Sequence, residues 1–329
     1  MAVQTLSGMT AAQRTILEDK TLERAQYTMQ HTRWARRRLF AEREGRKITY
    51  TRLTNFSAAT TALTEGAAPA GESLSTSVVS LTPDYYGSFI YLSRKLVQTG
   101  IFDLVNDDLP NMFGYQAALT ADTLCRDVLV AGGTAQIADG VSARTSLTAS
   151  NILDVEELYN ARRTLRKNSA LPFPEAGNKY ILIAHPDQLY DLMRDSEYQA
   201  AALYARERAP ENPIFGIPVM DIAGFRIYES ENVYIEDGGG AGTVDAYVAL
   251  AIGQFSYGLA GLGGMLPEHE EGGTETELRP VEIWWDDFDK YVPMRQKCSL
   301  AWMIHSDSAV LNANWLLRLE TAASKGANT

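Results

Sequence analysis

The most regular hydrophobic pattern of the chain lies between Phe102 and Ala131, where apolar or small residues recur three and four positions apart. This spacing predicts a helix with two apolar faces, and a helix of this length reaches roughly 45 Å. Acids near its start, Arg126 near its end and a following Gly pair agree with the dipole and C-cap rules. Pro110 either lies in the first turn of a helix capped by Asp108 or kinks one longer helix. Both alternatives predict a long strut that is too apolar to stand alone.

Before this helix the pattern is weaker and changes its period. Residues 10–44 contain no Pro or Gly and predict a helical arm with a narrow apolar stripe. Alternation over Ile48–Leu53 predicts a strand, and residues 56–71 are typical of a hairpin tip. Strand-like stretches follow over 74–78 and 86–92. A two-stranded ribbon is marginal in water, so this one must pack on another surface, which need not be in the same chain.

Past the Gly pair a second unit begins. Thr148 or Ser150 is expected to cap a helix that ends near Lys167, and an apolar strand over Lys179–Ala184 precedes a helix from Gln188 to Arg194. These elements predict a compact α/β domain. Further strands are expected at 217–220, 225–228, 244–252, 281–285, 299–305 and 315–319. The late strands predict that the C-terminal segment packs back on the long helix.

Composition supports a globular protein with a real core, since 45% of the residues are hydrophobic. No apolar run approaches the roughly 18 residues of a membrane span, and the N-terminus lacks the order of a signal peptide, so we expect a soluble chain and no membrane contact. Cys125 and Cys298 each stand beside apolar residues. We expect both to be small buried hydrophobes rather than a disulfide or metal ligands.

Charge is distributed unevenly along the sequence. Residues 1–52 carry a net charge of +6, so the remainder carries −17 of the total of −11. The sharpest basic run contains Arg36, Arg37 and Arg38, interleaved with aromatic residues. It predicts either a nucleic-acid site or a basic arm against an acidic protein surface. In the second case we expect the arginines to pair mostly with protein carboxylates, and we expect the arm not to bind DNA.

Motifs for catalysis or ligand binding are weak. Residues 253–264 follow a strand as a phosphate-binding loop does, but no helix begins after them. The four histidines have no metal-ligand spacing, and Asp286, Asp287 and Asp289 lack the Gly and the final Glu of a calcium loop. There is also no nucleophile elbow around a serine. We therefore expect no enzyme, no cofactor and no metal.

The order of these elements resembles the tailed-phage major capsid protein of the Hong Kong 97-type fold, in the branch typified by the capsid protein of phage N4. The resemblance extends from about Gly45 to Glu320. The motifs that carry it are Leu63-Thr64-Glu65-Gly66 with Pro69, Tyr86-Gly87, Leu92-Ser93, Gln116-Ala117-Ala118, Asp122-Thr123-Leu124, Arg126-Asp127 with Leu129, His185-Pro186-Asp187 and Tyr190-Asp191-Leu192-Met193.

This resemblance implies an α+β fold in five parts. Residues 1–52 look like an N-terminal arm, and 53–96 like the extended loop, a β-ribbon that reaches over a neighbouring subunit. Residues 97–147 look like the peripheral domain with its spine helix, 148–273 like the axial domain, and 274–329 like strands that rejoin the peripheral domain.

The implied function is that of a structural protein of the virion, assembled in the cytoplasm of a bacterial host. Copies of the chain would form the hexamers and pentamers of an icosahedral shell that encloses double-stranded DNA without sequence-specific binding. The implied partners are other copies, a portal, a separate scaffolding protein and, where the phage has one, a decoration protein. The residues expected at subunit interfaces are Leu63, Thr64, Glu65, Gly66 and Pro69 of the loop and Arg36, Arg37 and Arg38 of the arm.

Two departures from the founding phage's protein matter. Only about fifty residues precede the ribbon, which implies that the scaffold is a separate protein. No Lys occurs between Lys47 and Lys95, so the ribbon cannot form that phage's Lys-Asn cross-link. Two alternatives stay open: an encapsulin-type nanocompartment, which shares the fold, and a soluble carboxylate-dependent hydrolase built on Asp286 to Asp289.

Overall fold

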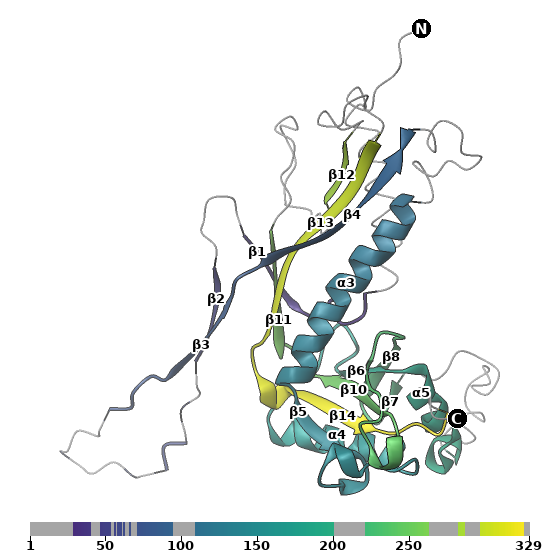
Figure 1. The fold of residues 1–329 in the computed structure, drawn as a ribbon. Coiled ribbons are helices and arrows are strands. Elements are labelled where there is room, and N and C mark those ends of the chain that lie inside the picture. Colours follow the sequence, from purple (N-terminus) through teal and green to yellow (C-terminus); the bar gives the residue numbers. More distant parts are fainter. Residues whose placement is uncertain are drawn as a thin grey trace.

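The computed structural model describes residues 29–40, 47–53, 56, 58–60, 62, 66, 71–94, 109–200, 221–262, 282–286 and 297–325. Within them the chain forms a two-stranded ribbon, a five-stranded sheet along a long helix, and a seven-stranded sheet with its own helices (Figure 1). The mixed content confirms the predicted α+β class.

The five-stranded sheet is built on the long strand β13. Its members are β1 (Arg36–Phe40), β4 (Asp84–Ser93), β11 (Tyr257–Leu262), β12 (Glu282–Asp286) and β13 (Lys297–Val310). One edge of β13 pairs antiparallel with β4, and its other edge pairs first with β12 and then with β11. Strand β1 lies parallel to β11. The predicted strands near 86–92, 281–285 and 299–305 are thus confirmed, whereas β11 lies in the stretch considered as a phosphate loop.

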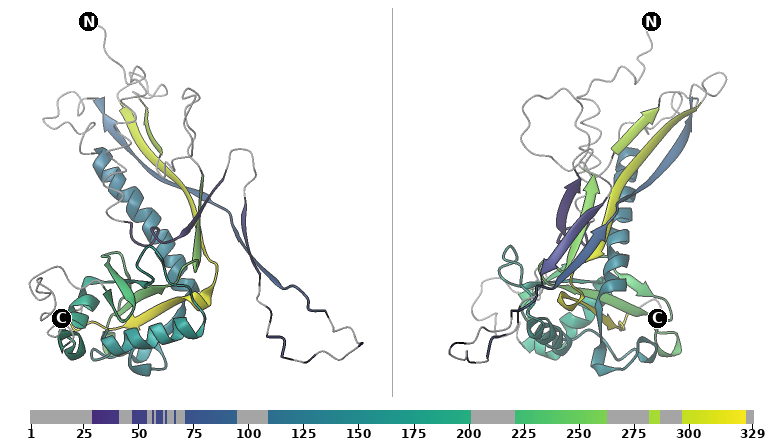
Figure 2. Two further views of the ribbon diagram at one scale, coloured as in Figure 1. Left: turned by 180° about the vertical axis from the view of Figure 1, so that it is seen from behind. Right: turned by 90° about the vertical axis from the view of Figure 1, so that its left-hand side faces the viewer.

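Helix α3 (Leu109–Gly132) runs along one face of this sheet (Figure 2). Between helix and sheet lie Leu92, Phe113, Ala117, Cys298, Leu300, Trp302 and Ile304, all buried. The Trp302 indole N–H also donates to Gln116 Oε1 over 2.9 Å. The described part of α3 begins at Leu109 and includes Pro110, so a first-turn Pro110 and a longer helix kinked at Pro110 both stay predictions. Asp108, the predicted cap, lies outside the described residues.

The seven-stranded sheet forms the compact body. Its order is β5-β14-β10-β6-β8-β7, with β9 also paired to β10. The strands are β5 (Thr134–Ile137), β6 (Tyr180–Ala184), β7 (Asp221–Ile222), β8 (Phe225–Glu229), β9 (Tyr234–Glu236), β10 (Ala246–Ile252) and β14 (Leu316–Thr321). Short 3-10 turns are Ala138–Gly140, Arg144–Ser146, Ala241–Thr243 and Ala313–Trp315.

Helices cover both faces of this sheet. Leu182 of β6 packs in the cluster that includes α4 (Val155–Lys167) and α5 (Pro186–Arg194). Ile181 and Ile183 point to the opposite face, where the end of α3 packs. Burial on both faces explains why β6 is continuously apolar, as predicted.

The C-terminal segment is divided between the two sheets. Strand β13 packs on α3 as expected, but β14 lies between β5 and β10 in the seven-stranded sheet. Helix α3 and the segment from β13 to β14 therefore connect the five-stranded sheet to the seven-stranded sheet.

Two local predictions were wrong. Helix α4 starts at Val155, because Asp154 caps it through a 2.8 Å bond from the Glu157 N–H, while Thr148 bonds to Asn151 instead. Residues 36–40 were expected in a helical arm but form β1. The open edge of β11 offers these residues backbone partners, and such tertiary pairing overrides a weak helical pattern. The predicted strand at 217–220 and most of the predicted arm lie outside the described residues.

Candidate subunit-interface surface

The ribbon consists of β2 (Ile48–Leu53) and β3 (Thr76–Leu81), which pair antiparallel and project from the body (Figures 1 and 2). At its root Leu81 is fully buried in a cluster with Ile48, Tyr50 and Ala260. Just beyond, the Thr82 N–H donates to Asp307 Oδ2 over 2.7 Å. A buried cluster and this bond to β13 therefore set the direction in which the ribbon leaves the subunit.

Away from the root, the ribbon exposes large apolar side chains. Leu53, Phe56, Leu74 and Val78 each expose more than half of their surface, between 57% and 61%. Isolated exposed apolar residues are common, but a concentration of them on one projecting element marks an interaction surface.

Of the five predicted interface residues in the loop, only Gly66 is described. It is exposed and has a φ of +80°, in the left-handed region that favours glycine. No atom lies within 4 Å of the position that a Cβ would take there. The other four, Leu63, Thr64, Glu65 and Pro69, lie outside the described residues.

Strand β4 carries a second exposed surface that the sequence interpretation did not single out. Tyr85, Phe89 and Tyr91, which we call the β4 stripe, expose 63%, 60% and 58% of their surface. Alternation along the strand places them on the face opposite Leu92, which is buried against α3. The rings of Phe89 and Tyr91 meet edge to face at 5.1 Å. The signal in the sequence was an uncharged aromatic run, interpreted earlier only as a strand.

The three arginines predicted at an interface stand exposed on β1. The guanidinium groups of Arg36 and Arg38 lie 5.9 and 5.6 Å from the Tyr50 ring centroid, within cation–π range. Arg38 also donates to the Thr49 carbonyl over 3.0 Å, and the Tyr50 hydroxyl donates to the Arg36 carbonyl over 3.0 Å. Burial raises the pKa of Tyr50, although Arg38 and Arg36 oppose the shift.

The expected pairing of these arginines with carboxylates is not seen in the described part of a single chain, and between copies it stays a prediction. There Arg36, Arg37 and Arg38 contact aromatic rings and backbone carbonyls and form no ion pair. Arg36 and Arg38 are therefore held against Tyr50 at the ribbon root, Arg37 lies near the Thr32 carbonyl, and no described carboxylate forms an ion pair with any of the three.

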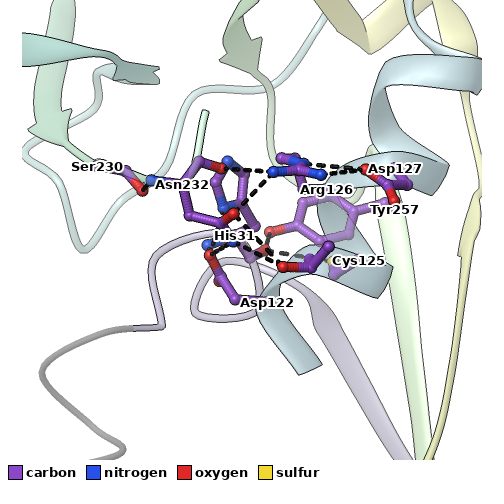
Figure 3. A network of polar contacts seen from close by, with 9 residues as sticks. His31, Asp122, Cys125, Arg126, Asp127, Ser230, Asn232 and Tyr257 are labelled. Carbon is purple, nitrogen blue, oxygen red and sulfur yellow. Dashed lines mark hydrogen bonds and ion pairs between the residues drawn. The ribbon is translucent and has the colours of Figure 1, made fainter. Parts of the chain in front are cut away.

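A buried polar network joins the start of the described chain to α3 (Figure 3). His31 and Asp122 are 1% and 0% exposed. Asp122 Oδ1 accepts the His31 backbone N–H over 2.7 Å, and Oδ2 accepts from His31 Nδ1 over 2.6 Å. The Tyr257 hydroxyl donates to the His31 carbonyl over 2.5 Å. His31 is thus held through its backbone N–H, its carbonyl and its ring.

The network continues into the loop between β8 and β9 (Figure 3). Asn232 Nδ2 donates to Asp122 Oδ2 over 3.1 Å, and Asn232 Oδ1 accepts from Arg126 Nη1 over 2.7 Å. The His31–Asp122 network, comprising His31, Asp122, Arg126, Asn232 and Tyr257, therefore connects the segment before β1, helix α3, the β8–β9 loop of the seven-stranded sheet and strand β11. Spacing in the sequence had no signal for it, because its members come from distant segments.

The other described side chains that were considered for catalysis or metal binding have structural roles. Cys125 and Cys298 are both buried, as predicted, and burial raises the pKa of the Cys125 thiol so that it stays protonated. His185 caps α5, and the His305 ring contacts Tyr85 at 4.4 Å. His269, Asp287 and Asp289 lie outside the described residues.

Across the residues that the structure describes, no group of His, Cys, Asp or Glu side chains has the arrangement of a metal site. No described helix is both long and apolar enough to cross a membrane.

The fold itself is similar to those of solved phage capsid subunits. The chain matches the capsid of Cyanophage P-SCSP1u with a TM-score of 0.63 at 14% identity, over 88% of this chain and 87% of that one. It matches the capsid of Ralstonia phage GP4 with a TM-score of 0.60 at 16% identity, over 100% and 94%. A virus-like particle from Pyrococcus furiosus matches with a TM-score of 0.52 at 9% identity, over 93% and 98%. The protein thus has a capsid fold of the Hong Kong 97 type.

The profile of the family described as phage capsid protein matches residues 76–292, more than half of the chain. Comparison with curated proteins gives no significant match. The chain therefore belongs to the phage capsid protein family. It is a major capsid protein, a structural and non-enzymatic subunit of the icosahedral shell of a tailed phage virion. This confirms the predicted function and decides against both the nanocompartment and the hydrolase.

Proposed function

We propose that copies of this chain assemble as hexamers and pentamers in which the β2–β3 ribbon of each subunit lies over a neighbour. The observation that carries this proposal is the contrast within the ribbon: a root buried around Leu81 and a projecting part with Leu53, Leu74 and Val78 exposed. A two-stranded element is stable only when its apolar surface is covered. In a shell of many copies the neighbouring subunit provides that cover.

We further assign the parts of the chain to the five roles that the resemblance implies. Residues 1–52 are the arm, 53–96 the extended loop, 97–147 the peripheral domain, 148–273 the axial domain and 274–329 the returning segment. Strand β14 pairs with β10, and β5 pairs with the other edge of β14, which supports an axial body that includes one strand from each flanking part.

We also propose that the chain belongs to the branch typified by the phage N4 capsid protein. Its proposed partners are those of a phage that packages DNA into a preformed shell. These are a separate scaffolding protein, a portal, a decoration protein where the phage has one, and double-stranded DNA enclosed without sequence-specific contacts. The loop residues Leu63, Thr64, Glu65, Gly66 and Pro69 and the arginines of β1 are assigned to subunit interfaces.

Electron microscopy of the expressed chain, alone and with the scaffolding protein of its phage, tests the proposal. We expect closed shells with six-fold and five-fold capsomers, and a reconstruction in which density for the ribbon crosses a subunit boundary. Closed shells whose ribbons fold back on their own subunit would refute the proposed contact.

A further inference from the structure

Strand β4 is paired along only one of its edges. Its register with β13 runs without interruption from Asp84 opposite Ser306 to Ser93 opposite Lys297. In the part of the chain that the structure describes, no strand pairs with the other edge between Tyr85 and Leu92. The neighbouring stretch of β13 differs, because Ser299–Met303 lies between β4 and β12 and is paired on both sides.

This edge has none of the features that normally keep edge strands from pairing. Natural edges are short, or carry charged residues, Pro or a bulge. The stretch Tyr85-Tyr86-Gly87-Ser88-Phe89-Ile90-Tyr91-Leu92 contains no charged residue and no Pro, and its register with β13 has no bulge. Its composition has high β-propensity and no charge, which is the pattern that favours addition of another strand.

Both faces of the edge are apolar and accessible. The β4 stripe is exposed by about three fifths on one face, and Tyr86 and Ile90 are each 36% exposed on the other. Gly87 keeps the strand close to β13, because a Cβ at this position would collide with the Trp302 carbonyl. The result is a strand that presents backbone groups and aromatic side chains together.

We propose that a strand from a second copy of this chain pairs, in the assembled shell, with the edge of β4 between Tyr85 and Leu92 that no described strand pairs, and that the β4 stripe packs against that copy. The inference deepens the proposed function, since it rests on the chain assembling with itself. Another copy is the partner that a shell of this chain supplies for every β4. The edge is also continuous with the ribbon through Thr82 and Pro83, so the contact extends the proposed interface.

Hydrogen exchange followed by mass spectrometry compares free subunits with shells assembled from this chain alone. In an antiparallel edge strand about half of the amide groups point away from the paired side. We expect those of Tyr85–Leu92 to exchange rapidly in the subunit and about tenfold or more slowly in the shell. The peptide covering Ser299–Met303 is the internal control, because its amides should be protected in both states.

The outcomes separate this inference from the proposed function. A chain that forms no shell under any condition would contradict the proposed function. Shells in which the β4 amides exchange as fast as in the subunit would overturn the inference and leave the function intact. Protection that appears only when a decoration protein is added to finished shells, or that is lost when the scaffolding protein leaves intact shells, would show that the occupant is not a second copy, and would also overturn it.

A pair of variants tests the stripe. Phe89→Lys should leave the subunit folded, because the side chain is exposed, yet shell yield should fall at least about tenfold since the charge would be buried at the contact. Phe89→Tyr keeps the aromatic surface and should assemble as the natural chain does. Normal yields from Phe89→Lys would overturn the packing of the stripe.

Discussion

His185 shows how one side chain links helix formation to pH. Its Nδ1 accepts the Asp187 backbone N–H over 3.2 Å at the start of α5, and Gln188 Oε1 accepts the His185 N–H over 3.1 Å. An Nδ1 that accepts this bond must be unprotonated. Burial lowers the pKa of His185 below its ordinary 6.5, and it outweighs the opposing effect of Asp187.

We therefore expect the free subunit to lose stability on acidification. Because the folded-state pKa is lowered, the unfolded chain takes up the proton first. The contribution of His185 is complete above about pH 6.5 and is lost as the pH falls through the lowered folded-state pKa. Urea unfolding of the natural chain and of His185→Asn, measured between pH 7.5 and about pH 5, checks this, since Asn caps without titrating.

The cap itself gives a second measurement on the same residue. His185→Ala should cost about 0.5–2 kcal/mol of unfolding free energy at neutral pH, while His185→Asn should cost little. Equal pH dependence in His185→Asn and the natural chain would show that other groups carry the acid sensitivity.

Asp122 is the buried acceptor on which the His31–Asp122 network depends. Asp122→Asn would place a side-chain NH2 group where a carboxylate oxygen now accepts hydrogen bonds from His31 and Asn232. At least one of these donors would then lose its acceptor. The expected loss of unfolding free energy is about 1–3 kcal/mol. Asp127→Asn is the matched control on the same helix, because Asp127 is 53% exposed and should change stability by less than about 0.5 kcal/mol. Similar losses for the two variants in urea unfolding would contradict the assigned role.

At the scale of elements, the ribbon is expected to be dispensable for folding and essential for assembly. Its root cluster around Leu81 lies in the strands, whereas deletion of residues 58–73 removes only the projecting end. The deleted subunit should keep its urea midpoint and form no closed shells, as judged by circular dichroism and electron microscopy. Normal shells from the deletion variant would mean that the ribbon is not an intersubunit element.

Elements also differ in how well their sequences predict them. The long helix, the strand Tyr180–Ala184 and helix α5 were found correctly, since each has a strong local pattern or cap. Strand β1 was missed because its structure depends on β11, more than two hundred residues away. Strand β11 itself was missed, since its glycines favoured a loop interpretation.

For the whole particle, substitution of the β1 arginines distinguishes an arm that contributes to shell assembly from an arm that binds the genome. Phosphate contacts by Lys and Arg add up with their number, so a wall that bound DNA tightly would hinder packaging and ejection. Arg36, Arg37 and Arg38 are exposed, and Arg36 and Arg38 contact Tyr50 at the ribbon root. Replacing all three with Ala should lower the yield of empty shells before it lowers DNA content per shell.

The control for charge alone is the triple variant Arg163→Ala, Arg166→Ala and Lys167→Ala on α4, which removes the same number of positive charges from exposed positions. Counts of empty and filled shells by electron microscopy compare the two variants. Abundant normal shells of the β1 variant that fail only to retain DNA would assign the patch to the genome.

The shell as a whole is expected to be held without covalent links through the ribbon. No Lys occurs between Lys47 and Lys95, so burial and charge pairing must supply the contacts. Each exposed ion pair contributes only about 0 to 1 kcal/mol, and salt weakens it, yet the pairs repeat in every copy. Boiled virions should run in denaturing detergent as a single band near 36.3 kDa. A ladder of covalent multimers would disprove this.

Some features of this protein follow from local sequence patterns or from amino-acid composition, and these could be predicted without a structure. The periodicity of 102–131, the composition of the ribbon and the cap at His185 predicted an elongated α+β subunit with an arm that needs a partner. Motif order then identified the capsid class, which the family match confirms.

Contacts between segments that are far apart in the sequence became known only from the three-dimensional structure. His31 and Asp122 are 91 positions apart, β14 enters a different sheet from β13, and the exposed edge of β4 is defined by the absence of a second partner among the described strands. The physical reason is that backbone pairing and burial are properties of two surfaces in contact. A local pattern states that a strand needs a neighbour, but the fold decides which neighbour it receives.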